Sequence, residues 1–223
     1  MKINGYDIEF DETKHEYTVD GVKVPSVTDI CSFITGEHYG GINPAVLEYA
    51  SRRGTAVHEA TEIIDYDGEP ELDAEIAPYV QAYVDFLSDY RPEWEMIEQI
   101  VYNPIYGYCG TIDRYGKVGK EWWVLDIKST ASPNREQYMS VCCQTSAYLM
   151  AIAPYTEQGM IAQRKALYLR KDGTYRLVDL TEWEVKNDLH AEQLFSRMAK
   201  LKRDIERIKH NGKKRNLKGS DTD

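Results

Sequence analysis

The chain has 223 residues, of which 42% are hydrophobic and 29% are charged, and its formal net charge is −10. These values suit one globular domain with its own core and exclude an intrinsically disordered chain. The opening segment MKINGYDIEF is polar, and no apolar run approaches the ~20 residues of a membrane-spanning helix. We therefore expect a soluble, cytoplasmic protein without a membrane partner.

The charge is distributed unevenly along the chain. Residues 197–218 hold ten Lys or Arg against Asp204 and Glu206, a net charge of +8, which leaves −18 on the remainder. A basic end on an acidic body is suited to contact with phosphate groups. A helix end that only keeps the protein soluble is an equally good interpretation.

The four cysteines are Cys31, Cys109, Cys142 and Cys143. They do not have the spacing of metal ligands, and adjacent cysteines are an awkward disulfide pair. We expect reduced thiols packed in the core and no iron–sulfur cluster.

The N-terminal part predicts a hairpin followed by helices. Alternating residues over 6–24, interrupted by DETK, are typical of two paired strands. Ser26 and Asp29 predict the start of a short helix over 26–34, and the following TGEHYGG predicts a loop. Asn43 and Pro44 then predict the start of a longer helix, because Asn caps helix N-termini and Pro suits the first helical position.

This longer helix, over 44–64, contains RRGTAVHEATEII. Gly54, His58 and Glu62 recur at four-residue spacing, so they share one face of the helix. A glycine inside a helix costs about 1 kcal/mol relative to alanine, so we expect Gly54 to have a packing role or to permit close approach of another group. A single helical histidine is most often a structural hydrogen-bonding residue, but neighbouring carboxylates make it a candidate metal ligand.

Residues 74–90 predict an amphipathic helix, and the segment WEMIEQIVYNPIYG predicts a strand. Glu98 lies on this strand. It either faces solvent or points into a site formed with the strands that follow.

The segment 107–130, GYCGTIDRYGKVGKEWWVLDIKST, predicts two antiparallel strands with a turn at KVGK. Side chains alternate along a strand, so Asp126 and Lys128 share one face, with Asp113 on the partner strand across from them. A pair of carboxylates holds a divalent cation, and a lysine beside it stabilises developing charge or positions a water. This group predicts a hydrolase, and we favour phosphodiester chemistry.

The helix predicted after residue 135 places Gln144 and Tyr148 one turn apart. They are either ordinary surface residues or contacts for a phosphate or a base. The remaining residues predict a hairpin that turns at Asp172–Gly173, then a long helix capped by Thr181 with Glu184.

The order of elements predicts an α/β (α+β) fold, with a central mixed β-sheet flanked by helices. We expect a single domain over 1–210, with a helical insertion at about 44–90. Residues 211–223 are predicted to be a basic, disordered tail.

Four motifs occur in a fixed order: His58 in GTAVHEATE, Asp113 in GTID, Asp126 with Lys128 in LDIKST, and Gln144 with Tyr148 in QTSAY. This order resembles the PD-(D/E)XK nuclease superfamily, in particular its RecB-like exonuclease branch, which includes phage exonucleases and the mitochondrial genome-maintenance exonuclease. The opening HEYTVDGVKVPSVTDI is similar to the start of phage-encoded members. The resemblance spans roughly residues 15–150.

The resemblance implies a restriction-endonuclease-like core that binds Mg²⁺ or Mn²⁺. The implied metal ligands are His58, Asp113, Asp126 and the carbonyl of Ile127, with Glu62 and Glu98 as outer or second-metal ligands. Lys128 is implied as the catalytic lysine, acting with Asp113 and Asp126. The implied contacts to nucleic acid are Gln144, Tyr148, Thr55 and Ser129. The iron–sulfur members carry a cysteine cluster near the C-terminus, which this chain lacks.

The implied function is a metal-dependent DNA exonuclease of phage or bacterial recombination or repair. Its substrate is single-stranded DNA or a duplex end, with a single-strand annealing protein or a helicase as a candidate partner. Two alternatives remain open: a structure- or sequence-specific endonuclease on the same fold, and a DNA-binding module without turnover. Exonuclease is favoured mainly by family analogy.

Overall fold

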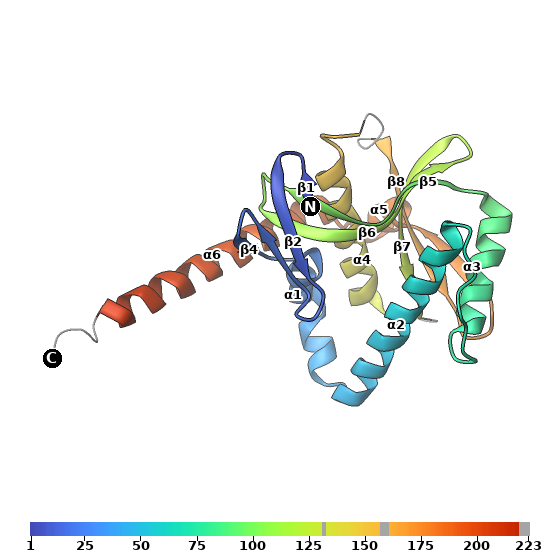
Figure 1. Cartoon of the computed structure of the whole chain (residues 1–223), viewed down its shortest axis with the longest axis horizontal. Helices are drawn as coiled ribbons and strands as arrows, with labels where there is room; N and C mark the ends of the chain where they lie inside the picture. The colour runs from blue at the N-terminus through green and yellow to red at the C-terminus, as the bar shows by residue number, and fades with distance from the viewer. Residues whose placement is uncertain (131–132, 157–160, 219–223) are drawn as a thin grey trace.

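The computed structural model describes residues 1–130, 133–156 and 161–218, without the side chains of 37–39 and 210–218 (Figure 1). The strands of the described part are β1 (Lys2–Ile3), β2 (Tyr6–Asp11), β3 (Glu16–Val19), β4 (Val22–Val24), β5 (Glu93–Asn103), β6 (Tyr108–Val118), β7 (Glu121–Lys128), β8 (Gln163–Leu169) and β9 (Tyr175–Asp179). Its helices are α1 (Val27–Gly40), α2 (Pro44–Asp65), α3 (Ala77–Tyr90), α4 (Arg135–Ile152), α5 (Leu180–Asn187) and α6 (Ala191–Lys218).

A mixed sheet with the strand order β5-β6-β7-β8-β9 forms the centre of the molecule. Its strands pair antiparallel except β7 and β8, which are parallel. A parallel pair needs a crossover connection, and α4 lies in the segment between these two strands. The predicted mixed sheet with flanking helices is confirmed, as is the antiparallel pairing predicted for 107–130.

Each face of the central sheet packs against its own group of helices. On one face, Val124 of β7 and Tyr168 of β8 pack in a core with side chains of α1, α4 and α6. On the other face, Leu125 and Ile127 pack with side chains of α2 and α3, including Phe86. The alternation along β7 therefore puts Asp126 on the face covered by α4, where it is fully buried.

The regular pattern of β5 and β6 is interrupted near Asp113. Ile97 pairs with Arg114 and Gln99 pairs with Ile112, so Glu98 lies between these pairs opposite Asp113. Glu98 has a backbone φ of +43°, a left-handed conformation that a non-glycine residue rarely adopts inside a strand. This local distortion lies where the candidate catalytic residues meet.

A second sheet, ordered β1-β2-β3-β4, covers one end of β5 and β6. Tyr17 is buried in this contact, and its hydroxyl hydrogen-bonds the Thr111 hydroxyl at 2.9 Å. The small sheet leads directly into α1. Ser26 directly precedes this helix and caps it, because its hydroxyl accepts from the Asp29 backbone N–H at 2.9 Å. The predicted helix start is therefore confirmed.

Two N-terminal elements differ from their predictions. The second predicted strand of the first hairpin is divided into β3 and β4, because Asp20 and Gly21 both adopt positive φ and turn the chain. The loop predicted after residue 34 is wrong, since α1 continues to Gly40. Gly36 and Gly40 weaken a helix pattern in the sequence, and the packing of α1 against α4 and α6 overrides that preference.

The long C-terminal helix is also divided. Asp188 adopts a left-handed φ of +52° and ends α5, and α6 begins at Ala191. Asp179, and not Thr181, caps α5 by accepting from the Glu182 backbone N–H at 2.9 Å. Helix α6 then projects away from the rest of the molecule (Figure 1) and runs to Lys218, so the part of the predicted tail up to that residue is helical. Residues 219–223 lie outside the described residues.

All four cysteines are free and buried, as predicted. Within the described parts of the chain, no helix is both long and apolar enough to cross a membrane.

Candidate active site

Three side chains from three different elements converge beside the end of β7. His58 comes from α2, Glu98 from β5 and Asp113 from β6, and one ligand atom of each lies within 4.8 Å of the others. Asn43 fixes the start of α2 by accepting from the Ala45 N–H at 2.9 Å. His58 therefore reaches the sheet from a helix whose start was readable in the sequence.

His58 is held by contacts to both of its ring nitrogens. Its Nδ1 lies 2.8 Å from Oε1 of Glu98, and its Nε2 lies 3.1 Å from the carbonyl oxygen of Ile127 and 3.9 Å from Oδ2 of Asp113. Burial alone lowers the pKa of His58, but the negative charges of Asp113 and Glu98 outweigh it and raise this pKa to about 9. In the metal-free protein the imidazole is therefore protonated at neutral pH and donates from both nitrogens.

Asp113 is aligned by the backbone of the neighbouring strand. Its Oδ2 accepts from the Ile127 N–H at 2.7 Å, and its side chain is 7% exposed. Burial raises the pKa of this carboxyl, while the His58 cation opposes that rise. A divalent cation in this place would keep the carboxylate ionised.

Asp126 and Lys128 form a pair on β7. Lys128 Nζ lies 2.8 Å from each carboxylate oxygen of Asp126, whose side chain is fully buried. Burial alone lowers the pKa of Lys128, but Asp126 and Asp113 outweigh it and raise the pKa, so the amine stays cationic. Among the described residues, the contact of Nζ with Oδ2 is an ion pair without hydrogen-bond geometry. The pair thus offers a fixed positive charge and a buried carboxylate.

A buried arginine stabilises the carboxylates around the cluster. Arg114 is 0% exposed and donates from Nε to Asp65 at 2.5 Å, from Nη1 to Glu98 at 2.9 Å and from Nη2 to the Thr61 hydroxyl at 3.1 Å. Burial raises the pKa of Glu98, but His58 and Arg114 outweigh it and hold the pKa below its ordinary value. Glu98 is therefore an ionised carboxylate that orients His58.

Gln144 and Tyr148 lie on the face of α4 that covers the sheet. Gln144 Nε2 donates to the Tyr148 hydroxyl at 2.9 Å, and both side chains are more than nine-tenths buried. A Cβ added to Gly110 would lie 2.8 Å from the Tyr148 ring, so this glycine lets the ring approach β6. The predicted pair is thus part of the packed site and is not on the outer helix surface.

The donor set fits a divalent cation. Carboxylate oxygens, a backbone carbonyl and one imidazole nitrogen meet here, and the buried carboxylate of Asp126 is suited to the same role. Oxygen-rich sites suit Mg²⁺, and an added imidazole also suits Mn²⁺.

Some predicted site residues lie outside the His58 cluster. Glu62 is half-buried and is not part of it. Thr55 is exposed, and Ser129 is half-buried with its carbonyl accepting from Arg53 Nη2 at 3.0 Å. Among the described residues, a Cβ added to Gly54 would meet no atom within 4 Å, so the expected packing role is wrong. The alternative, that Gly54 permits close approach of another group, stays a prediction.

Sequence reasoning missed Arg114, Asp65 and Arg53. The available signal was an arginine next to Asp113 in a strand of apolar and aromatic residues, since a charge at such a position is buried only when paired. Its partner Asp65 lies 49 residues earlier at the end of α2, and no local pattern connects them.

A mixed sheet that carries a His–carboxylate cluster beside a buried Asp–Lys pair is typical of a metal-dependent hydrolase. The chain matches the PD-(D/E)XK nuclease superfamily over residues 45–216, and it belongs to that superfamily. The protein is therefore a nuclease of a class that uses divalent metal ions.

The chain is also similar to a solved structure described as the crystal structure of LHK-Exo in complex with dAMP. The TM-score is 0.39 with 14% sequence identity, over 86% of this chain and 94% of that one. No curated protein matches the chain.

Proposed function

We propose that this protein is a Mg²⁺- or Mn²⁺-dependent DNA exonuclease. The observation that carries the proposal is the convergence of His58, Glu98 and Asp113 within 4.8 Å, next to the Asp126–Lys128 pair. Nucleases break phosphodiester bonds, and the chain belongs to a nuclease superfamily. The cluster supports hydrolysis of such a bond with the help of a metal ion.

The proposed metal ligands are Asp113, Asp126, the Ile127 carbonyl and His58 through Nε2. The bound cation would neutralise phosphate charge and lower the pKa of a water molecule. Glu98 accepts from Nδ1–H of His58 and so directs the Nε2 lone pair toward the ligand position. Glu98 then acts through His58, and we assign it an orienting role in place of the outer-ligand role that the resemblance implied.

Lys128 supplies the fixed positive charge of the reaction. Its ammonium group is kept beside the cluster by Asp126 and is half-buried, so it does not have to be ordered when substrate binds. We assign it to stabilise the negative charge that develops on the phosphate oxygens and to position the attacking water. Gln144 and Tyr148 border the same site and are assigned to contact the DNA strand.

We further propose a role in phage or bacterial DNA recombination or repair, in the cytoplasm, with single-stranded DNA or a duplex end as substrate. A single-strand annealing protein or a helicase is the proposed protein partner. The support for this role is the likeness of the motif order to phage exonucleases. The basic segment 197–218 supplies positive charge for nucleic acid, with a net charge of +8.

The test is digestion of linear DNA labelled separately at each end, beside a closed circle, with Mg²⁺, Mn²⁺ or EDTA. Metal-dependent loss of the linear DNA with an intact circle is the expected result, and the order of label release gives the polarity. Cleavage of the circle would favour an endonuclease. Binding of DNA without cleavage in either metal would favour a DNA-binding module and would contradict the proposal.

A further inference from the structure

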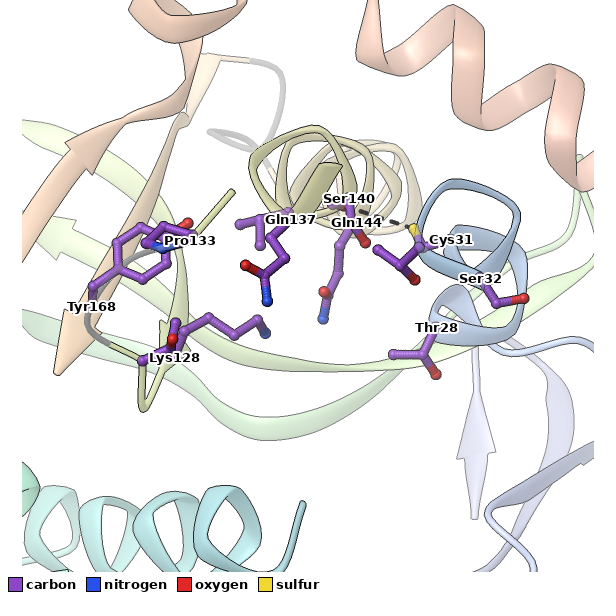
Figure 2. Close-up of a pocket in the computed structure, with 12 residues that line it drawn as sticks. Thr28, Cys31, Ser32, Lys128, Pro133, Gln137, Ser140, Gln144 and Tyr168 are labelled. Carbon is purple, nitrogen blue, oxygen red and sulfur yellow. Dashed lines mark hydrogen bonds between the residues drawn. The ribbon is translucent and has the colours of Figure 1, made fainter. Parts of the chain in front are cut away.

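A cavity of about 370 Å³ opens beside Lys128, between α1 and α4 (Figure 2). Lys128 and Gln144 form its border with the candidate active site. From α1 it is lined by Thr28, Cys31, Ser32 and Thr35, and from α4 by Gln137, Ser140 and Val141. This volume is at the lower end of the range for small-molecule pockets, roughly 300–1,000 Å³, so it suits one small group and not a long stretch of polymer.

The lining is almost uncharged. Among the described residues that line the cavity, Lys128 is the one charged side chain, and Asp126 already pairs with it. The N-terminus of α1 is also closed to anions, because Asp29 carries a negative charge in the first turn and the Ser26 side chain caps that turn. A phosphate deep in this cavity would find no further cation among these residues.

The cavity does offer uncharged groups that both donate and accept hydrogen bonds. The amide groups of Gln137 and Gln144 extend into it from α4 (Figure 2). Gln137 Oε1 accepts from the Asn134 backbone at 2.9 Å, which leaves its amide nitrogen to donate elsewhere. Tyr168 also lines the cavity, and its buried hydroxyl has no hydrogen-bond partner among the described residues. A buried polar group without a partner costs free energy that a bound ligand can recover.

Apolar surfaces lie between these polar groups. The Tyr168 ring, Pro133 and Val141 form part of the wall, and the Cys31 thiol, whose pKa burial raises to about 12, adds a neutral group. A nucleobase has two flat apolar faces and an edge of mixed donors and acceptors. The combination of apolar walls, amides and hydroxyls matches a nucleoside.

We propose that this cavity binds the terminal nucleoside of the DNA strand, through its base and sugar and without a terminal phosphate. The inference rests on the proposed nuclease function, because Lys128 at the border places the next phosphodiester at the metal cluster. A strand whose end occupies this cavity is cleaved one nucleoside from that end. The preferred substrate is therefore a strand with an unphosphorylated end.

The test blocks the cavity from its exposed side. Thr28→Phe and Ser32→Phe each add a ring at an exposed position of α1, so neither ring enters the protein core. Ser88→Phe, at an exposed position of α3 away from the cavity, is the matched control. We expect both blocking variants to raise KM for linear DNA on the order of ten-fold or more, while the control keeps the KM of the unchanged protein.

A second measurement uses thymidine alone as the probe. Thymidine is expected to inhibit the unchanged protein competitively and to bind it in ligand-observed NMR without turnover. In the blocking variants both effects should be lost. Equal inhibition and binding in Ser32→Phe and the unchanged protein would overturn the inference.

The third measurement varies the chemistry of the strand end. Strands with hydroxyl ends should be cleaved at least as fast as the same strands with a 5′- or a 3′-phosphate. A rate that increases ten-fold or more with a terminal phosphate would overturn the inference while leaving the nuclease proposal intact. If the unchanged protein cleaves no DNA in either metal, the proposed function fails, and the thymidine binding still decides whether the cavity holds a nucleoside.

Discussion

Glu98 and His58 form the closest contact of the metal cluster, with Oε1 of Glu98 lying 2.8 Å from Nδ1 of His58. Glu98 makes this contact from a left-handed backbone conformation, with φ at +43° in the interior of β5. Such a conformation costs on the order of 1–3 kcal/mol and persists only where the surroundings hold it. Arg114 and His58 both bind this carboxylate, so the distortion of β5 serves to aim Glu98 at the histidine.

We predict that Glu98→Gln weakens Mn²⁺ binding by about 10- to 100-fold, as loss of an orienting partner does at other metal sites. The amide preserves the size of the side chain but removes the charge that orients His58. Calorimetric titration with Mn²⁺ measures the change. Glu95→Gln, at an exposed position of the same strand, is the control and should bind Mn²⁺ as the unchanged protein does. Equal affinities in the two variants would exclude an orienting role.

Arg114→Met is expected to lower the free energy of unfolding by about 3–5 kcal/mol, because it leaves two carboxylates without their cation. These are the buried carboxylate of Asp65 and the partly buried carboxylate of Glu98. Urea denaturation in EDTA measures the loss. Arg176→Met, at an exposed position of β9, should change stability little. Similar losses in the two variants would show that Arg114 has no special structural role.

Lys128→Ala is expected to abolish DNA cleavage, with a loss of at least about 10²–10³-fold, as for removal of one transition-state donor. DNA and metal binding should be largely retained, because the proposed ligand atoms remain. Single-turnover cleavage and a fluorescence binding assay separate the two effects. Lys120→Ala in the exposed turn between β6 and β7 is the control. A cleavage rate near that of the unchanged protein would remove Lys128 from the mechanism.

The stability of the metal-free protein should depend on pH through His58. Its pKa is about 9 in the folded protein and about 6.5 when unfolded. Below pH 6.5 both states are protonated and the stabilisation by Glu98 and Asp113 is fully present. Between pH 6.5 and 9 the unfolded state loses the proton first, so the free energy of unfolding falls as pH rises.

Urea denaturation in EDTA across this range measures the fall. His58→Ala should make it smaller, and an unchanged pH dependence in that variant would contradict the assignment. Metal binding depends on pH in the opposite direction, because His58 must lose its proton to bind a cation through Nε2. Mn²⁺ affinity is therefore expected to increase with pH up to about 9, with release of protons measurable in buffers of different ionisation enthalpy.

Local sequence patterns were sufficient to predict most of the helices and strands near the site. The alternation over 107–130 predicted β6 and β7, and the cap residues Asn43 and Ser26 marked the starts of α2 and α1. The sequence failed where packing opposed local preference. Helix α1 continues through glycines because α4 and α6 cover it, and the C-terminal helix breaks at Asp188 although the sequence there has no glycine or proline.

The break before α6 has a tertiary cause. Glu184 pairs with the buried Arg164 of β8 and also accepts from the Ala191 backbone N–H at 2.9 Å. One carboxylate thus holds α5 against the sheet and fixes the start of α6. The sequence presents Glu184 as an ordinary capping-box residue, because its arginine partner lies on a different element.

By itself, the sequence determined the kinds of chemical group at the site and the elements that carry them. Spacing fixed Asp126 and Lys128 on one strand face and His58 on a helix, because these relations depend on the periods of strands and helices alone. The tertiary structure decided how these groups meet. The role of Glu98, its support by Arg114 and Asp65, and the nucleoside-sized cavity all depend on contacts between distant segments, which no local periodicity encodes.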